Sequence, residues 1–220
     1  MGTITLLPET TKNPITLIGQ RAGVCWGADT SDPLKNKQRG WDCIYSGHGR
    51  TLEFVNIEMI LDGYSARVIR EWYTHIGGAP TRLQASTRYI NYEEFGYIMP
   101  PSIAAVEDAG EKYQEVMREI GHSINVLTDM GIPREDAAML LPLGMTTRVV
   151  DKRNLRNLID MSRQRMCNRA YWEFRELFDD IYKALWHYSE EWADICESQF
   201  FPKCELLERC PEKHGCGRWD

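Results

Sequence analysis

The side chains best suited to chemistry in this chain begin in residues 80–89, which read PTRLQASTRY. This segment holds Arg82, Gln84, Ser86 and Arg88, and it follows a pair of glycines instead of an apolar run. A guanidinium presents a fixed fork of donors that matches a phosphate or a carboxylate. The segment is therefore a candidate anion site, and a solvated charged loop is the alternative.

A second polar cluster occupies residues 154–175. If this stretch is helical, Arg156, Asp160 and Arg163 fall on neighbouring positions of one face, because residues three and four apart are neighbours on a helix. Arg165 is turned away from Arg163 by about 200°, at roughly 100° per residue. The alternative is an exposed helix stabilised by Asp–Arg pairs, each of which contributes only a few tenths of a kcal/mol.

The composition bounds the class of protein. The chain has 220 residues, 43% of them hydrophobic, which predicts a single domain over residues 1–220 with a sizeable core. Its formal net charge of −6 argues against nucleic acid as a general partner, because duplex binders usually carry a basic excess. No long apolar run and no secretory signal pattern is visible, so the sequence predicts a cytoplasmic protein without a membrane partner.

The elements that position the polar clusters follow from apolar periodicity and turn residues. Strands are expected at residues 4–7, 15–18, 52–61, 89–92 and 145–150, with a turn at Asp62-Gly63. Helices are expected at 65–73 with Ser65 as N-cap, at 102–130 with Gly131 as C-cap, at 133–140, at 154–168 and at 169–195, and loops at 19–49. No βαβ alternation or dinucleotide fingerprint is present, so we expect an α+β fold, an antiparallel sheet packed with several long helices.

Several separated motifs occur in a recognisable order. They are SGH at 46–48, LEF at 52–54, THI at 74–76, QASTRY at 84–89, LPL at 141–143, NLRNL at 154–158, Arg165, and YWE at 171–173. Together they resemble the flavin-dependent thymidylate synthases, whose motifs include Arg-His-Arg, Ser-x-Arg-Tyr, Leu-Pro-Leu and Asn-x-Arg-x-Leu followed by an arginine. The resemblance covers roughly residues 45–176 and rests on order, spacing and residue type.

The chain departs from the family pattern at several of these motifs. Thr-His-Ile replaces Arg-His-Arg, and the segment from there to Ser86 is about two residues longer than usual. Phe54 stands where the family has a histidine, and an arginine that the family places shortly before Leu-Pro is absent, although the nearby acid remains as Glu135. The resemblance therefore implies a divergent member of the family.

The resemblance also implies a reaction. The family methylates dUMP to dTMP, with methylenetetrahydrofolate and NADPH as co-substrates and FAD as the cofactor. It implies the thymidylate synthase-complementing fold and a homotetramer, because the family assembles its flavin site from several subunits. Two alternatives remain: a non-catalytic nucleotide-binding relative, and a flavin- and folate-dependent enzyme that modifies a pyrimidine nucleotide to a different product.

The site residues that the resemblance implies divide into three groups. Arg165 is the candidate catalytic residue, because an arginine aimed at the uracil carbonyls would stabilise the charge that develops there. The candidate dUMP contacts are Glu71, Thr74, Gln84, Ala85, Ser86, Thr87, Arg88 and Arg165. The candidate FAD contacts are Asn56, His75, Ile76, Gln84, Asn154, Leu155, Arg156 and Asp160.

Two of these residues have an alternative role. Ser86 could instead act as a nucleophile, but no activating histidine dyad is apparent in the sequence, so a nucleotide contact is favoured. His75 could instead be a core histidine, because it follows an apolar helix.

The C-terminal tail, residues 196–220, is rich in cysteine. Four thiols and an imidazole form a sufficient ligand set for a structural zinc ion. The spacing lacks a Cys-x-x-Cys pair, so we expect free buried or surface thiols and no metal. The residues are Cys196, Cys204, Cys210, His214 and Cys216.

Overall fold

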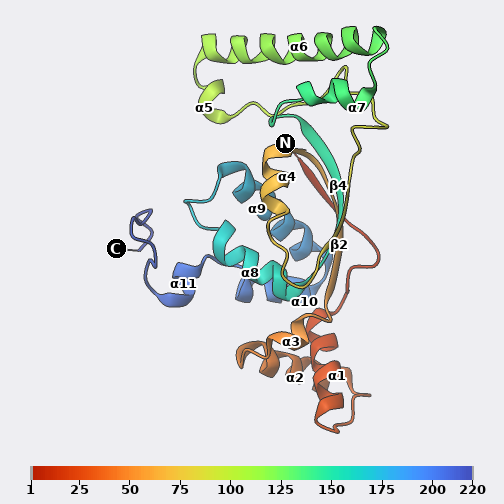
Figure 1. Ribbon diagram of the computed structural model, residues 1–220. Helices are drawn as coiled ribbons and strands as arrows, with labels where there is room; N and C mark the ends of the chain where they lie inside the picture. Colours follow the sequence, from red (N-terminus) through yellow and green to blue (C-terminus); the bar gives the residue numbers. More distant parts are fainter. Residues whose placement is uncertain (1, 220) are drawn as a thin grey trace. The chain divides into compact units, whose positions relative to one another are not determined.

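The computed structural model describes residues 2–219 and confirms the expected α+β class (Figure 1). One four-stranded antiparallel sheet has the order β1-β2-β4-β3. The strands are β1 (Thr3–Leu6), β2 (Asn56–Ser65), β3 (Thr81–Gln84) and β4 (Thr146–Asn154). The helices are α1 (Pro14–Cys25), α2 (Pro33–Tyr45), α3 (Gly49–Leu52), α4 (Ala66–Trp72), α5 (Pro101–Ala104), α6 (Glu107–Asp129), α7 (Arg134–Ala137), η1 (Ala138–Leu140), α8 (Leu155–Arg165), α9 (Trp172–Tyr188), α10 (Glu190–Gln199) and α11 (Lys203–Leu207).

The chain divides into two compact units. The first comprises the described residues up to Thr3, Leu61–Thr74 and Leu83–Val149. The second comprises Ile4–Ile60, His75–Arg82 and the described residues from Val150 onward. The expectation of one domain over residues 1–220 stays a prediction.

In the first unit, the expected helix at 65–73 is confirmed as α4. Its N-cap Ser65 accepts a hydrogen bond from the backbone N–H of Val68 at 3.2 Å, as a short hydroxyl side chain at that position should. The expected turn at Asp62-Gly63 is wrong, because β2 continues through it to Ser65. Gly63 adopts φ of +77°, a conformation that glycine reaches without strain.

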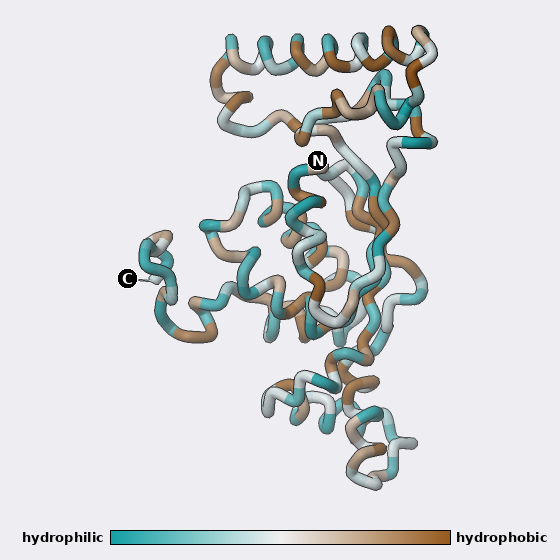
Figure 2. Tube along the Cα trace, viewed as in Figure 1, coloured by the Kyte–Doolittle hydropathy of each residue, from teal (hydrophilic) through white to brown (hydrophobic). Residues whose placement is uncertain are grey.

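The long helix expected at 102–130 is two helices, α5 and α6. Val106 is extended and separates them, and Gly131 with φ of +84° follows the end of α6 as expected. α6 alternates polar and apolar residues along its length (Figure 2) and buries only one narrow stripe that includes Met117 and Ile124. The helix expected at 133–140 is confirmed as α7 followed by η1.

Another strand expectation in the first unit is wrong. Residues 89–92 form no strand, and β3 forms instead at Thr81–Gln84, where no strand was expected. Just after β3, the backbone N–H of Ala85 donates to the carbonyl of Arg148 at 2.8 Å. β3 therefore forms because it pairs with β4, which is distant in the sequence. The strand propensity of residues 81–84 alone does not reveal this pairing.

In the second unit, two expectations near the N-terminus are wrong. Residues 15–18 belong to α1, and the expected loops at 19–49 contain most of α1 and all of α2. The glycines that suggested loops lie where these two helices approach closely. A Cβ on Gly19 would collide with the carbonyl of Asn36, and a Cβ on Gly40 would collide with that of Ile15.

A distant side chain also explains why α1 is helical. Buried Glu191 of α10 accepts hydrogen bonds from the backbone N–H of Thr16, at 2.9 Å, and from the Thr16 hydroxyl. It thereby satisfies an N-terminal N–H that lacks a partner within the helix. Pro14 at the first helical position adds a fixed φ that suits a helix start.

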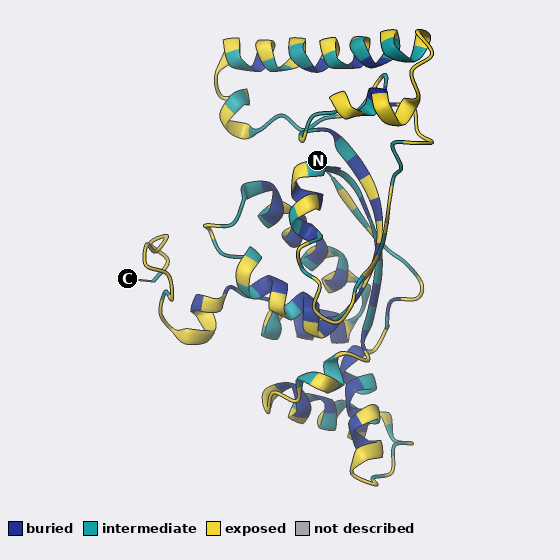
Figure 3. Cartoon of the chain, in the orientation of Figure 1, coloured by how far each residue is buried: buried dark blue, intermediate teal, exposed yellow. Residues whose placement is uncertain are grey.

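The core of the second unit includes one buried face of each of the helices α8, α9 and α10, where Figure 3 shows dark blue. The helix expected at 154–168 is confirmed as α8. The helix expected at 169–195 is interrupted at Ser189, which ends α9 in an extended conformation and caps α10. β2 starts four residues later than expected, because α3 precedes it. Within residues 2–219, no helix is long and apolar enough to cross a membrane.

Candidate functional site

The second unit places Arg165 at the last position of α8, where its side chain meets His75. The helix begins at Asn154, whose Oδ1 accepts a hydrogen bond from the backbone N–H of Asn157 at 2.9 Å. At the other end, Nε of Arg165 donates to Nε2 of His75 at 2.9 Å. The structure thus joins the candidate catalytic arginine to a residue assigned to the flavin.

An aromatic ring packs against both members of this pair. The guanidinium carbon of Arg165 lies 4.6 Å from the centroid of the Phe174 ring, in cation–π geometry. The His75 ring meets the same phenyl ring edge-on, with centroids 5.9 Å apart. Phe174 is a fully buried residue of α9, and its ring restricts the movement of both side chains. We refer to Arg165, His75 and Phe174 as the arginine cluster.

The electrostatics of the arginine cluster keep His75 neutral. Burial, together with the positive charges of Arg165 and Arg153, lowers the pKa of His75 to about 4. A neutral imidazole has one acceptor nitrogen, and the bond from Arg165 assigns that role to Nε2, which leaves the proton on Nδ1. The imidazole therefore orients the arginine without competing with it for an anion.

The strand β4 carries a buried ion pair that the sequence did not predict. Asp151 and Arg153 of β4 have side chains with no exposed surface, and they pair through two bonds of 2.6 and 2.8 Å. A third nitrogen of Arg153 donates to Asn157 Oδ1 at 2.7 Å, which ties the strand to α8. The sequence feature that could have predicted this pair is the spacing of two between Asp151 and Arg153, because residues two apart on a strand lie on the same face.

The other residues assigned to FAD in the second unit differ in accessibility. Arg156 is half exposed and pairs with Glu53 at 2.6 Å. Ile76 is 69% exposed, whereas the Leu155 side chain is fully buried. Desolvation raises the pKa of Asp160, and the charges of Arg156 and Arg163 oppose that rise.

Two more residues assigned to FAD, Asn154 and Asn56, have close contacts within the protein. Gly78 has φ of +72°, and any Cβ there would collide with the amide of Asn154. Asn56, in β2, donates to the carbonyl of Glu9 at 2.9 Å and to the Glu58 carboxylate at 3.2 Å. The amide of Asn56 is therefore already used by the protein.

The residues assigned to the nucleotide phosphate lie in the first unit, in and after β3. The Gln84 amide donates to the Thr147 hydroxyl at 3.3 Å. The Ser86 hydroxyl accepts from the backbone N–H of Arg88 at 3.2 Å, which fixes a tight turn. Ala85 and Thr87 are half-buried, and Arg88 points its exposed guanidinium at Glu135, with Nε to Oε2 at 2.7 Å. We refer to residues 84–88 as the arginine loop.

The two remaining candidate dUMP contacts are Glu71, in the last turn of α4, and Thr74, just after that helix. The Thr74 hydroxyl donates to the carbonyl of Glu71 at 2.7 Å, and Glu71 is half-buried. Within the first unit, the structure therefore brings Ser86 to Arg88 and Thr74 to Glu71. Within the second unit it brings His75 to Arg165. The site roles of all these residues stay predictions.

The cysteines of the C-terminal tail are free thiols, as are the others in the chain. In the described part of the chain, no three His, Cys, Asp or Glu side chains gather in a way that could hold a metal ion. Burial raises the pKa of the Cys196 thiol to about 12, so that group stays protonated at neutral pH.

Comparison with known proteins identifies the family of this chain. The sequence pattern of the thymidylate synthase complementing protein family matches residues 6–188. The flavin-dependent thymidylate synthase of Nitratidesulfovibrio vulgaris is 28% identical over 186 residues, covering 80% of this chain and 74% of the relative. That of Geobacter sulfurreducens is 27% identical over 188 residues, covering 81% and 80%. That of Pyrococcus furiosus is 30% identical over 179 residues, covering 76% and 69%.

The family match includes the arginine loop, the arginine cluster and the strands that carry them. It ends at residue 188, so α10, α11 and the C-terminal tail lie beyond it. This chain belongs to the thymidylate synthase complementing protein family.

Proposed function

We propose that this protein is a flavin-dependent thymidylate synthase. It converts dUMP to dTMP, with methylenetetrahydrofolate as the carbon donor, NADPH as the reductant and FAD as the cofactor. The observation that carries this proposal is the hydrogen bond from Arg165 to a neutral His75, in a chain that belongs to the family. The neutral imidazole holds the Arg165 guanidinium in place through this bond.

Arg165 acts on the uracil ring. Methyl transfer to C5 requires negative charge to develop on the ring carbonyls, and a preorganised cation stabilises that charge without reorganising during the reaction. His75 acts as a positioning residue, because its Nε2 fixes the plane of the Arg165 guanidinium. Phe174 excludes water from one face of the pair.

The arginine loop binds the nucleotide phosphate. Arg88 supplies a charge-assisted donor, and Ser86 supplies a hydroxyl hydrogen while its oxygen accepts from the backbone. Glu135 orients Arg88 through Nε, which leaves the guanidinium plane fixed. Gln84, Ala85, Thr87, Glu71 and Thr74 complete the proposed dUMP contacts.

The residues assigned to FAD fit such a cofactor in their chemistry. Arg156 is half exposed and suits a pyrophosphate, and exposed Ile76 suits the apolar face of a ring system. Gly78 lets the backbone approach the Asn154 amide closely, which keeps that amide in place. When bound, the flavin would supply the reducing equivalents that complete the methyl group. Asn56, His75, Gln84, Leu155 and Asp160 are the other proposed contacts.

Product analysis tests the proposed function. Purified protein is supplemented with FAD, dUMP, methylenetetrahydrofolate and NADPH, and the nucleotides are separated by chromatography. We expect dTMP to form and each reagent to be required. A hydroxymethyl nucleotide would instead identify an enzyme with a different product. Protein that stays colourless, takes up no FAD and still binds dUMP would be a non-catalytic nucleotide binder.

A homotetramer is the proposed assembly. It is supported by the family resemblance and by large apolar side chains that the chain exposes, among them Leu83, Met130 and Met139. Mass photometry of the FAD-loaded protein should give about four times the 25.5 kDa chain mass. A monomer at assay concentration would contradict this assembly.

A further inference from the structure

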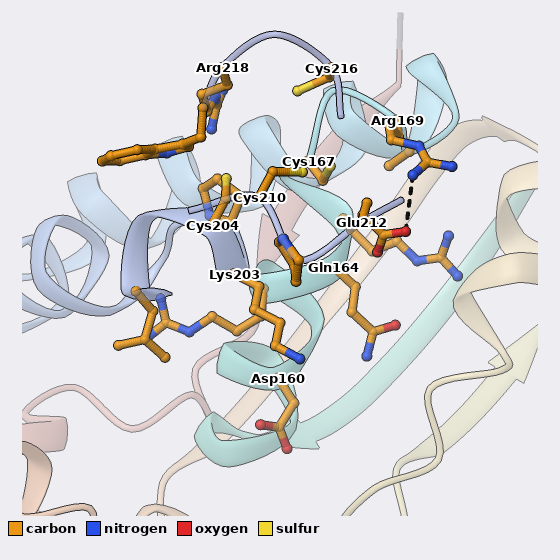
Figure 4. Close-up of a pocket in the computed structure, with 17 residues that line it drawn as sticks. Asp160, Gln164, Cys167, Arg169, Lys203, Cys204, Cys210, Glu212, Cys216 and Arg218 are labelled. Atoms are coloured by element: carbon orange, nitrogen blue, oxygen red, sulfur yellow. Dashed lines mark hydrogen bonds and ion pairs between the residues drawn. The ribbon is translucent and has the colours of Figure 1, made fainter. Parts of the chain in front are cut away.

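A cavity of about 830 Å³ lies in the second unit (Figure 4), and Arg165 is one of the residues that line it. One wall consists of the end of α8 and the loop after it, including Arg165. The other wall consists of α11 and the tail up to Trp219. The volume is in the range of pockets that hold a cofactor-sized ligand. The cavity therefore reaches the candidate catalytic arginine from the side of the C-terminal tail.

The cavity is strongly cationic in a chain whose net charge is −6. Five of its lining residues are cations and two are carboxylates. Arg169 pairs with Glu212 at 3.0 Å, and Arg218 is 3.6 Å from Glu205, so part of the charge is balanced. Lys203 forms no ion pair with any residue in 2–219. The remaining excess of positive charge is suited to a ligand with more than one anionic group.

The same cavity offers a flat aromatic surface. Trp219 lines it, and the indole Nε1 of Trp219 is buried without a hydrogen-bond partner among the described residues. A buried donor without an acceptor costs free energy. Pro202, Leu206 and Pro211 add apolar surface beside it. Stacking surface next to cations is typical of sites for phosphorylated nucleotides.

One wall of this cavity lies in the C-terminal segment, beyond the residues that the family pattern matches. The family match ends at residue 188, whereas Lys203, Arg218 and Trp219 lie beyond it. Arg163 of α8 joins the two walls: its guanidinium lies 3.5 Å from the Phe201 ring centroid and donates to the Phe201 carbonyl at 3.3 Å. The tail is thus held against α8 by specific contacts.

We propose that this cavity binds the phosphate-bearing part of the nicotinamide nucleotide reductant, with Lys203 and Arg218 as phosphate contacts and Trp219 beneath the base. The assignment rests on the proposed function, because that reaction consumes a reductant of this chemistry. The reductant's phosphates match the excess of cations, and its adenine matches the indole. Because Arg165 also lines the cavity, a reductant bound there would lie near the candidate catalytic arginine.

Thiol protection tests binding without relying on activity. Cys210 and Cys216 line the cavity, whereas Cys25 is exposed and does not. FAD-loaded protein is alkylated with iodoacetamide, and the rate at each cysteine is measured by peptide mass spectrometry. The probe is 2′-phospho-ADP-ribose, which cannot transfer a hydride. We expect it to slow alkylation of Cys210 and Cys216 severalfold while Cys25 is unchanged.

The same experiment is repeated with folate polyglutamate and with dUMP as competing ligands. Protection by folate polyglutamate or by dUMP, with none from 2′-phospho-ADP-ribose, would overturn the proposal. Equal rates with and without every ligand would also overturn it. Weaker protection by ADP-ribose, which lacks the 2′-phosphate, would support the phosphate assignment.

A pair of matched variants tests the two cations. Lys203→Ala/Arg218→Ala removes two cavity cations, and Lys213→Ala/Arg209→Ala removes two exposed tail cations that do not line the cavity. We expect the first variant to raise the KM for NADPH about tenfold or more, with the KM for dUMP nearly unchanged. The second variant should match the wild type. Equal effects of both variants would mean that only general charge matters and would refute the site.

The failure of this inference can be separated from failure of the proposed function. Wild-type protein that forms dTMP but shows no protection by the probe refutes the cavity assignment alone. Wild-type protein that shows protection and forms no dTMP refutes the synthase proposal while nucleotide binding in the cavity stands.

Discussion

Nε of Arg165 donates a hydrogen bond to Nε2 of His75 across 2.9 Å, although the two residues are 90 positions apart in the chain. Burial keeps the imidazole neutral, and the Phe174 ring packs against both side chains. The bond fixes the plane of a permanently charged guanidinium. It also connects the central residue of the Thr-His-Ile motif to the end of α8.

Replacement of His75 tests its positioning role. His75→Ala should lower kcat about tenfold or more with a smaller change in the KM for dUMP, because a hydrogen bond to a charged group contributes roughly 1.5–3 kcal/mol. His75→Gln should recover part of kcat, because its carbonyl oxygen can accept from Arg165. His48→Gln is the control, since His48 is exposed and contacts Ser46 instead. Equal kcat losses for Ala and Gln would contradict this role.

The low pKa of His75 predicts how stability depends on pH. The folded chain binds a proton at His75 with a pKa of about 4, whereas the ordinary value is 6.5. Between these values the unfolded state holds more protons, so the free energy of unfolding falls as the pH is lowered from about 6.5 to about 4. Urea titrations across this range should show a shallower dependence for His75→Gln than for the wild type. Parallel curves would show that His75 does not titrate as described.

The arginine loop predicts a loss of nucleotide affinity on charge removal. Arg88→Ala should weaken dUMP binding by about 2–3 kcal/mol, because a charge-assisted contact to the phosphate is lost. Glu135→Gln should change binding by less than about 1 kcal/mol, because the Arg88–Glu135 pair is exposed. Isothermal titration calorimetry measures both. Unchanged affinity in Arg88→Ala would remove Arg88 from the phosphate site.

The buried pair in β4 predicts a large stability effect. Asp151→Asn should lower the free energy of unfolding by about 3–5 kcal/mol, because it leaves the buried Arg153 charge without its partner. Lys152→Ala is the matched control on the same strand, where an exposed pair with Glu58 contributes about 0–1 kcal/mol. Chemical denaturation of the two variants measures the difference. Similar losses in both would mean that the pair is not structurally important.

The local sequence predicted several elements correctly because their signals are local. Ser65 capped α4 as expected, Gly131 followed the long helix region, and the helix expected at 154–168 formed as α8 within a few residues of those bounds. The expected loops at 19–49 failed for a nonlocal reason. Gly19 and Gly40 serve the contact between α1 and α2, and a single sequence does not distinguish a glycine at a helix crossing from one in a turn.

The sequence by itself determined the family, the α+β class and the identities of the chemical groups. These properties depend on the order of the motifs and on residue type, and both can be read directly from the sequence. Only the tertiary structure decided which groups meet. It joined Arg165 to His75, buried Asp151 with Arg153, and folded the tail against α8 to form a cationic cavity. The physical reason is that burial sets the protonation of His75 and the cost of an unpaired Arg153, and burial depends on contacts between distant residues.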